Sequence, residues 1–142
     1  MAGESVKVGE KRYRERFGRY FEDFDLGATY EHRPGRTVSE ADNTWFALLT
    51  MNQHPVHFDA EYAKHTEFGR PLVVSTLTLS ILVGMSVSDT SQKAIANLGW
   101  TDIKLTHPVF ASMRHRAHGR RSNVWLQHSR RPSRRNTRGL SS

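Results

Sequence analysis

The apolar segment at residues 71–85 constrains the fold more than any other feature of the sequence. Over residues 75–87 its apolar side chains follow a helical pattern, with Leu77, Ile81 and Met85 on one stripe and further apolar residues on the other sides. A helix that is apolar on most sides has to be buried. Ser and Thr interrupt the run, and it is shorter than a bilayer span. We therefore predict a central helix at residues 75–87, enclosed by the rest of a domain.

A histidine-containing loop at residues 52–59 lies between that segment and an apolar stretch at residues 44–50. Pro55 ends any helix and forces His54 into extended geometry. His57 follows two residues later. A polar loop held between two core elements is a typical position for a functional site. This loop is therefore the first candidate.

The residues on either side of the loop carry helix signals. Ser39 is a good N-cap with Asp42 three residues on, close to a capping box, so a helix should follow it. Asn52 falls at the carboxyl end of that helix, where left-handed geometry suits Asn. Asp59 is a candidate N-cap for one or two further helical turns. We also expect a short helix or aromatic edge segment at residues 17–24.

Two strands are expected elsewhere. One covers residues 28–33 and is broken by Pro34 and Gly35. The other covers residues 100–109, where apolar residues partly alternate and where His107 would be a strand residue. Residues 1–16 are polar and without periodicity, which predicts a disordered leader.

Charge divides the chain sharply. Residues 1–111 carry 12 Lys and Arg against 14 Asp and Glu, whereas residues 112–142 carry nine Arg and no acid. The second part has no strand or helix period and is typical of low-complexity basic sequence. We therefore divide the chain into the leader 1–16, a domain at 17–110 and an Arg-rich tail at 111–142, which is either disordered or derived from a frameshift.

Composition excludes several kinds of site. The chain has no Cys, so disulfides, thiolate metal sites and Cys nucleophiles are excluded. His54 and His57 are too few for a metal shell, so we expect no metal and no cofactor. The amino terminus lacks the apolar region of a secretory signal, and we expect a cytoplasmic protein with no membrane partner. An Arg-rich tail without a recognised motif is a weak nucleic-acid signal, so that partner is not expected.

Several motifs together resemble one known family, the MaoC-like dehydratases, which form the (R)-specific enoyl-CoA hydratase branch of the hot-dog fold. The motifs are FEDFDLG at 21–27, TVSEAD at 37–42, NQHPVHFD at 52–59, FGRPLV at 68–73 and LTHPVF at 105–110. The resemblance covers about two thirds of the chain and departs from the family after residue 110. Within the family it is most similar to the branch that includes mesaconyl-CoA hydratases and β-methylmalyl-CoA dehydratases.

The resemblance implies an α+β hot-dog fold, in which an antiparallel sheet wraps around the central helix, and a homodimer. It also implies an acyl-CoA substrate and an acid/base pair in the motif Asp-x-Asn-Pro-x-His. His57 falls on the motif His, while Asn52 stands at the Asp position and His54 at the Asn position. The His-Gly before the central helix in the family is Val74-Ser75 here.

Hydration of an enoyl thioester needs a base, an acid and a group that holds the thioester oxygen. His57 can exchange protons near neutrality and serves as base. Asn52 cannot carry a proton but can orient a water, with Asp42 or Asp59 as supporting acids. The backbone N–H of Ser75, at the amino end of the helix, suits a developing negative charge.

Two functions stay open at this point. The first is an acyl-CoA hydratase or dehydratase of the hydro-lyase type, inactive if the strands after residue 110 are missing through truncation or a frameshift. The second is a non-catalytic hot-dog subunit that binds acyl-CoA or has a structural role, which the missing Asp favours.

Overall fold

The computed structural model describes residues 4–120. Its regular elements, in chain order, are β1 (Glu4–Gly9), β2 (Arg12–Arg16), β3 (Thr29–Thr37), α1 (Glu40–Leu49), α2 (Ala60–Lys64), α3 (Ser75–Ser86) and β4 (Arg114–Arg120). Three short turns join them, namely η1 (Phe21–Asp23), η2 (Pro55–His57) and the π-helical η3 (Val87–Ser91). The expected central helix is therefore present, with its first residue where the pattern placed it.

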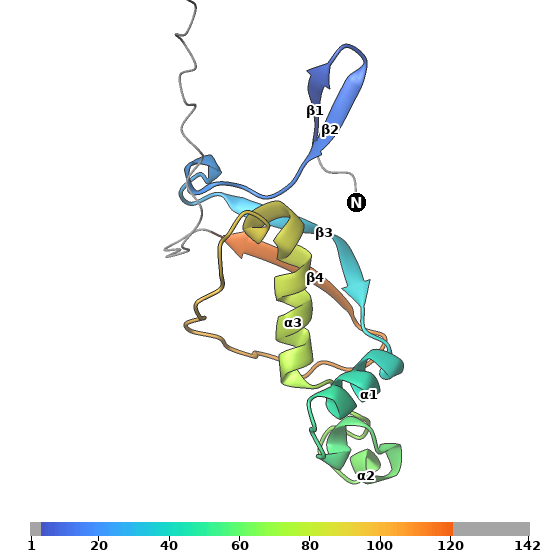
Figure 1. The fold of residues 1–142 in the computed structure, drawn as a ribbon. Helices are drawn as coiled ribbons and strands as arrows, with labels where there is room; N and C mark the ends of the chain where they lie inside the picture. The colour runs from blue at the N-terminus through green and yellow to red at the C-terminus, as the bar shows by residue number, and fades with distance from the viewer. Residues whose placement is uncertain (1–3, 121–142) are drawn as a thin grey trace, which may run out of the picture.

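Helix α3 lies across a two-stranded sheet formed by β3 and β4 (Figure 1). The strands are antiparallel, with Thr29 opposite Arg120 and Thr37 opposite Arg114. Because the sheet covers one side of the helix, α3 buries Leu77 and Thr78, and most of its other apolar residues are half-buried. The enclosure on all sides that the sequence predicted is not reached within residues 4–120.

The buried core lies at the amino end of α3, where α1 and the segment before α3 meet. Its members are the apolar residues Val38, Ala47, Val73, Val74 and Leu77. Backbone bonds fix this junction, since Val38 N–H donates to Met113 O at 3.1 Å and Val73 N–H donates to Val109 O at 2.8 Å. Everything that positions the candidate site therefore converges on one end of α3.

The segment at residues 4–16, where polarity predicted disorder, forms an antiparallel hairpin of β1 and β2 that extends away from the sheet (Figure 1). Val6 and Val8 alternate with polar residues, the period of a strand, and Lys11 in the turn takes a positive φ of 53°. All residues of β2 are exposed. The backbone ladder, rather than burial, holds this hairpin, so the polarity from which disorder was predicted does not exclude it.

Strand β3 runs past Pro34 and Gly35, where the sequence predicted a break. The register with β4 shifts between His32 and Arg36. Pro34 lies in this irregularity, and a bulge needs no ladder N–H from proline. Strand β4 lies in the segment assigned to a disordered tail, and its ladder with β3 stabilises it. Residues 121–142 of that tail lie outside the described part.

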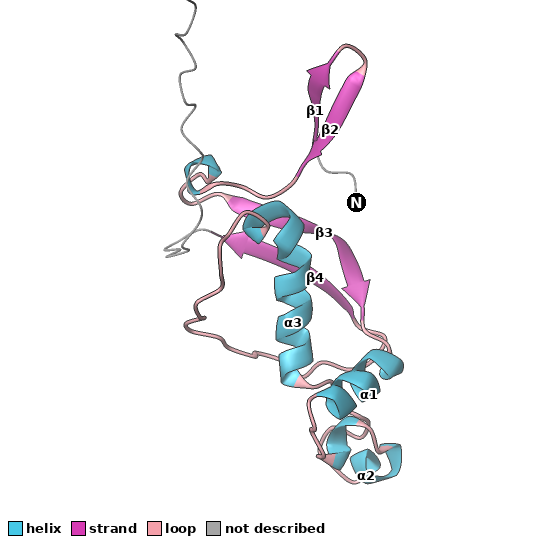
Figure 2. Ribbon diagram, viewed as in Figure 1, coloured by secondary structure: helices cyan, strands magenta, loops and turns pink. Residues whose placement is uncertain are grey.

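Residues 100–109, predicted as a strand, form an extended loop that returns from η3 to the amino end of α3 (Figure 2). Trp100, Ile103 and Leu105 are all exposed. Among the residues that the structure describes, the only isolated β-bridge at the end of this loop joins Leu72 to Phe110. A strand needs a neighbour, and alternation alone does not supply one. Within residues 4–120, no helix is both long and apolar enough to cross a bilayer.

Candidate functional site

His57 ends the turn η2, and the structure fixes which of its ring nitrogens is free. Pro55 begins that turn, and the His54 ring accepts a hydrogen bond from Val56 N–H at 3.2 Å. The His57 Nδ1 atom lies 2.8 Å from the carbonyl oxygen of Leu72. A carbonyl can only accept, so Nδ1 carries the proton and donates it. In the neutral ring Nε2 is then the basic atom, which is the form that a general base requires.

Asn43, a residue that the sequence argument did not single out, holds His57 and the start of α3 together. It is only 3 % exposed. Its Nδ2 donates to His57 O at 2.7 Å and to Leu72 O at 3.1 Å, and its Oδ1 accepts from Val74 N–H at 2.8 Å. One buried amide thus ties α1, η2 and the backbone that leads into α3. The signal in the sequence that could have identified Asn43 is its spacing of four residues from Ala47, which places both residues on the same face of α1.

Asn52 makes two hydrogen bonds within this part of the chain. Its Oδ1 accepts from His54 N–H at 3.1 Å, and its own N–H donates to Ala47 O at 2.9 Å. The left-handed residue at the end of α1 is Met51, with φ 55°, so the expectation of that geometry at Asn52 was wrong. The His54 ring packs edge-on between His57 and Tyr62, each centroid 6.0 Å away.

The two candidate acids cap helices. Asp59 accepts from Tyr62 N–H at 3.0 Å as the N-cap of α2. Asp42 and Ser39 form a reciprocal capping box at the start of α1, as predicted. Hydrogen bonds from Ser39, and then the Arg36 guanidinium 2.6 Å away, lower the pKa of Asp42. A carboxylate held in this way stays ionised and is a poor proton donor.

Ser75 opens α3, and no side chain among the described residues caps that helix, whose N-cap residue is Val74. The first helical N–H groups to bond a carbonyl are those of Leu77 and Thr78, at 3.0 and 3.3 Å from Val74 O. The N–H of Ser75 precedes them and stands outside the internal ladder. This N–H therefore lies at the amino end of the helix, where the partial positive charge of the helix dipole is greatest.

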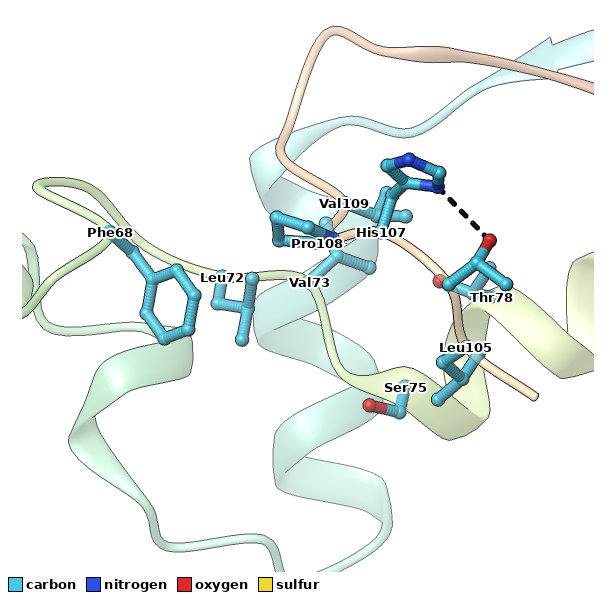
Figure 3. A pocket seen from close by; sticks show the side chains of 10 residues that line it. Phe68, Leu72, Val73, Ser75, Thr78, Leu105, His107, Pro108 and Val109 are labelled. Atoms are coloured by element: carbon cyan, nitrogen blue, oxygen red, sulfur yellow. Dashed lines mark hydrogen bonds between the residues drawn. The ribbon is translucent and has the colours of Figure 1, made fainter.

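A cavity of about 260 Å³ opens at this end of α3 (Figure 3). It is lined by Phe68, Leu72, Val73, Ser75, Thr78, Leu105, Thr106, His107, Pro108 and Val109. His107, taken from the sequence as a strand residue, thus lies in an exposed loop beside the cavity. Of the predicted site residues the structure brings only Ser75 to the lining. His57 connects to the cavity through Leu72, and Asn52, His54, Asp42 and Asp59 do not line it.

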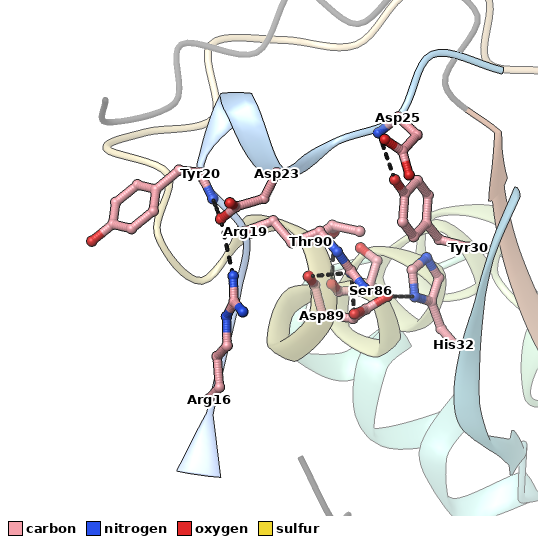
Figure 4. Close-up of polar contacts among 10 residues, drawn as sticks. All are labelled: Arg16, Arg19, Tyr20, Asp23, Asp25, Tyr30, His32, Ser86, Asp89 and Thr90. Carbon is pink, nitrogen blue, oxygen red and sulfur yellow. Dashed lines mark hydrogen bonds and ion pairs between the residues drawn. The ribbon is translucent and has the colours of Figure 1, made fainter. Parts of the chain in front are cut away.

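A second polar cluster lies at the other end of α3 (Figure 4). Asp89 in η3 pairs with Arg19, and the buried His32 has its Nδ1 3.4 Å from Asp89 Oδ2. Thr90 Oγ1 donates to Ser86 O at 2.7 Å. Through Asp89, the π-helical turn is thus joined to β3 by His32 and to the chain before β3 by Arg19. Among the side chains that the structure describes, residues 5–114, no group of three or more His, Asp or Glu is placed to hold a metal.

Comparison with known proteins identifies relatives over most of the chain. A family model described as "MaoC like domain" matches residues 23–136, and so continues beyond the domain boundary that composition placed near residue 110. A mesaconyl-CoA hydratase of Cereibacter sphaeroides is 32 % identical over 93 residues, which are 66 % of this chain and 27 % of the relative. A β-methylmalyl-CoA dehydratase of Chloroflexus aurantiacus is 35 % identical over 83 residues, 58 % of this chain and 24 % of the relative. The chain spans about a quarter of the length of these curated relatives.

Solved structures agree on the fold. A monoamine oxidase regulatory protein from an Archaeoglobus species superposes with a TM-score of 0.63 and 36 % identity, over 72 % of this chain and 70 % of that one. The unliganded R-hydratase of Pseudomonas aeruginosa has a TM-score of 0.60 at 23 % identity, over 70 % and 62 % of the two chains, a likeness of fold alone. The predicted hot-dog fold is thereby confirmed.

Proposed function

Because this chain belongs to the MaoC-like domain family, we propose that it binds an enoyl-CoA thioester and adds water reversibly across its double bond. The observation that carries the proposal is the tautomer of His57, whose Nδ1–H is donated to Leu72 O and whose Nε2 is left basic. The same carbonyl belongs to the segment that leads into α3 and its cavity. The curated relatives with printed activities are hydratases and dehydratases of CoA esters.

In this proposal His57 Nε2 takes a proton from water while the water oxygen bonds to the β-carbon. The π electrons of the double bond move towards the thioester, whose oxygen gains negative charge. The backbone N–H of Ser75 holds that oxygen, because orphan N–H groups at a helix start stabilise a developing oxyanion. The His57 imidazolium then returns a proton to the α-carbon, and Asn52 orients the attacking water.

The hydratase proposal is tested by following loss of the conjugated double bond of mesaconyl-CoA and crotonyl-CoA. His57→Ala should lower the rate by about 10²–10⁴-fold, the usual contribution of a general base. Tyr62→Phe is the matched control, since it keeps the ring beside His54 and should change the rate little. Equal turnover by wild type and His57→Ala would contradict the proposal.

A second function is favoured by the capped carboxylates. Asn52 replaces the acid that the family motif carries, Asp59 is the N-cap of α2, and Asp42 is held in the capping box of α1. The chain would then be a hot-dog subunit that binds acyl-CoA without converting it. Retained acyl-CoA binding with no turnover at any pH would favour this reading.

We also propose that the chain forms a homodimer and that it is located in the cytoplasm. Light scattering of the purified chain tests the homodimer.

A further inference from the structure

The hairpin of β1 and β2 lies before the part of the chain that the family model matches. The hairpin covers residues 4–16, and the match begins at residue 23. Its described side chains, residues 5–16, are all exposed, and it extends away from the β3–β4 sheet (Figure 1). A two-stranded hairpin without further packing is only marginally stable in water. A further strand beside it would therefore stabilise it.

Each strand of the hairpin has one edge that is not paired with another strand among the residues that the structure describes. An open edge presents backbone N–H and C=O groups that an added strand can join. The two edges differ in sequence. Strand β2 carries Arg12, Arg14 and Arg16, which share one face because they are two residues apart. Strand β1 carries Val6 and Val8 on that same face, since Val6 stands opposite Arg14.

Charge opposes pairing of β2 with the β2 strand of a second copy. In a two-fold antiparallel pair, a residue stands opposite its own copy or opposite a residue an even number of positions away. Centring the pair on Arg14 sets Arg12 opposite Arg16. Centring it on Tyr13 sets Arg12 opposite Arg14, and centring it on Glu15 sets Arg14 opposite Arg16. Centring it on Arg12 or Arg16 sets that residue opposite its own copy. Like charges directly opposite are destabilising, so β2 disfavours a copy of itself in every register.

Strand β1 suits a copy of itself. Centring the pair on Val6 sets Val6 opposite its own copy, and this register pairs residues 4–8 of the six-residue strand. Ser5 then stands opposite Lys7, and Glu4 opposite Val8, so no like charges face each other. Centring on Lys7 would instead set two lysines opposite each other. Val6 and Val8 are 41 % and 49 % exposed, so both have apolar surface left to bury. The hydrophobic pattern thus specifies the register around Val6.

We propose that the outer edge of β1 is a self-association surface, on which the β1 strand of a second copy pairs antiparallel around Val6. The two hairpins then form one four-stranded sheet with the β2 strands at its edges. Edges rich in charged side chains resist further strand addition, so the assembly closes as a two-fold pair. The contact uses residues before the family match and is separate from the homodimer proposed for the domain. One strand pair is a small interface, so the association should be weak.

Cysteine cross-linking tests the pairing and its register together. The natural chain has no Cys, so a single introduced Cys can pair only with its own copy. Opposite residues in an antiparallel pair have Cβ atoms about 4.5–5.5 Å apart, close to the separation in a disulfide. Under mild oxidation Val6→Cys should form a disulfide-linked dimer at least about 10-fold faster than Tyr13→Cys on β2. Tyr13 is the more exposed residue, at 66 %. Val8→Cys, which falls opposite Glu4, should also be slow.

A charge variant tests the same contact without a cross-link. Val6→Glu sets like charges opposite each other at the centre of the pair. Within its own hairpin the new carboxylate stands opposite Arg14, so the hairpin gains a favourable pair. Sedimentation equilibrium from about 1 μM to 1 mM should show the association step weakened by about 10-fold. Tyr13→Glu is the matched control, since Tyr13 stands opposite Lys7 on the other face of the hairpin, and it should leave the association unchanged.

Three results would overturn the inference. Equal rates of cross-linking at positions 6, 8 and 13 would show random collision rather than a fixed register. A wild-type chain that stays monomeric over the whole concentration range would show that the edge does not associate. An association that Val6→Glu leaves unchanged would assign the assembly to the domain alone. None of these results bears on the hydratase proposal, because His57 and Ser75 lie outside the hairpin.

Discussion

Substitution of Asn43 is the sharpest test of how the candidate site is built. The buried amide satisfies Val74 N–H, His57 O and part of Leu72 O. In Asn43→Ala the Val74 N–H and the His57 carbonyl lose this partner, while Leu72 O keeps the bond from His57. An unsatisfied buried backbone group costs about 1–3 kcal/mol, so two such groups predict a loss of about 2–6 kcal/mol. Domains are stable by only about 5–15 kcal/mol, so this loss is large.

Asn43→Asp refines the test because it has nearly the same shape. An ionised carboxylate would keep the bond from Val74 N–H but would face the oxygens of His57 and Leu72, which cannot donate. Burial and these oxygens should raise its pKa above the usual value of about 3.9. When a carboxyl group has a higher pKa in the folded state than in the unfolded state, the free energy of unfolding falls as pH rises above the unfolded-state pKa. The variant should therefore lose stability relative to wild type as pH rises from about 4 towards 7.

Urea unfolding followed by circular dichroism measures both effects. Asn97→Ala is the matched control, since the Asn97 side chain only accepts from Gly99 N–H in an exposed turn, and such changes usually cost less than about 0.5 kcal/mol. Losses below about 0.5 kcal/mol at pH 7 for both Asn43 variants would refute the reasoning. The reasoning would also be refuted if the loss of stability caused by Asn43→Asp, relative to wild type, did not increase as pH rises.

Two further predictions concern backbone geometry and caps. Ser39→Ala removes the capping box with Asp42 and should lower the free energy of unfolding in urea by about 1 kcal/mol at pH 7. Because the pKa of Asp42 is lowered in the folded state, the difference in stability between the variant and wild type should shrink as pH falls through that pKa. A difference that stays constant with pH would contradict this prediction. Gly18→Ala should destabilise, since φ is +63° and a Cβ would meet Lys93 N at 3.0 Å. Gly84→Ala, a helical position with nothing within 4 Å of a Cβ, should instead gain up to about 1 kcal/mol; equal effects of the two substitutions would refute the argument.

Short-range signals were readable from the sequence because both partners lie a few residues apart. The capping box of Ser39 and Asp42, the N-cap role of Asp59 and the start of α3 at Ser75 are all of this kind. The family motifs added the fold, which no periodicity specifies by itself. The hairpin and β4 were missed for a different reason. Their stability comes from pairing with another strand, and composition reports burial rather than pairing.

The long-range part of the site was not readable because its contacts use the backbone. Asn43 meets a carbonyl 14 residues away, a carbonyl 29 residues away and an N–H 31 residues away. Every residue has a carbonyl and all but proline have an N–H, so such partners leave no trace in side-chain identity. His57 shows the same limit, since its residue type predicts a base but only Leu72 O selects the tautomer that makes Nε2 basic. The sequence thus identifies which groups can react, and the path of the main chain decides which atom of each group is free to do so.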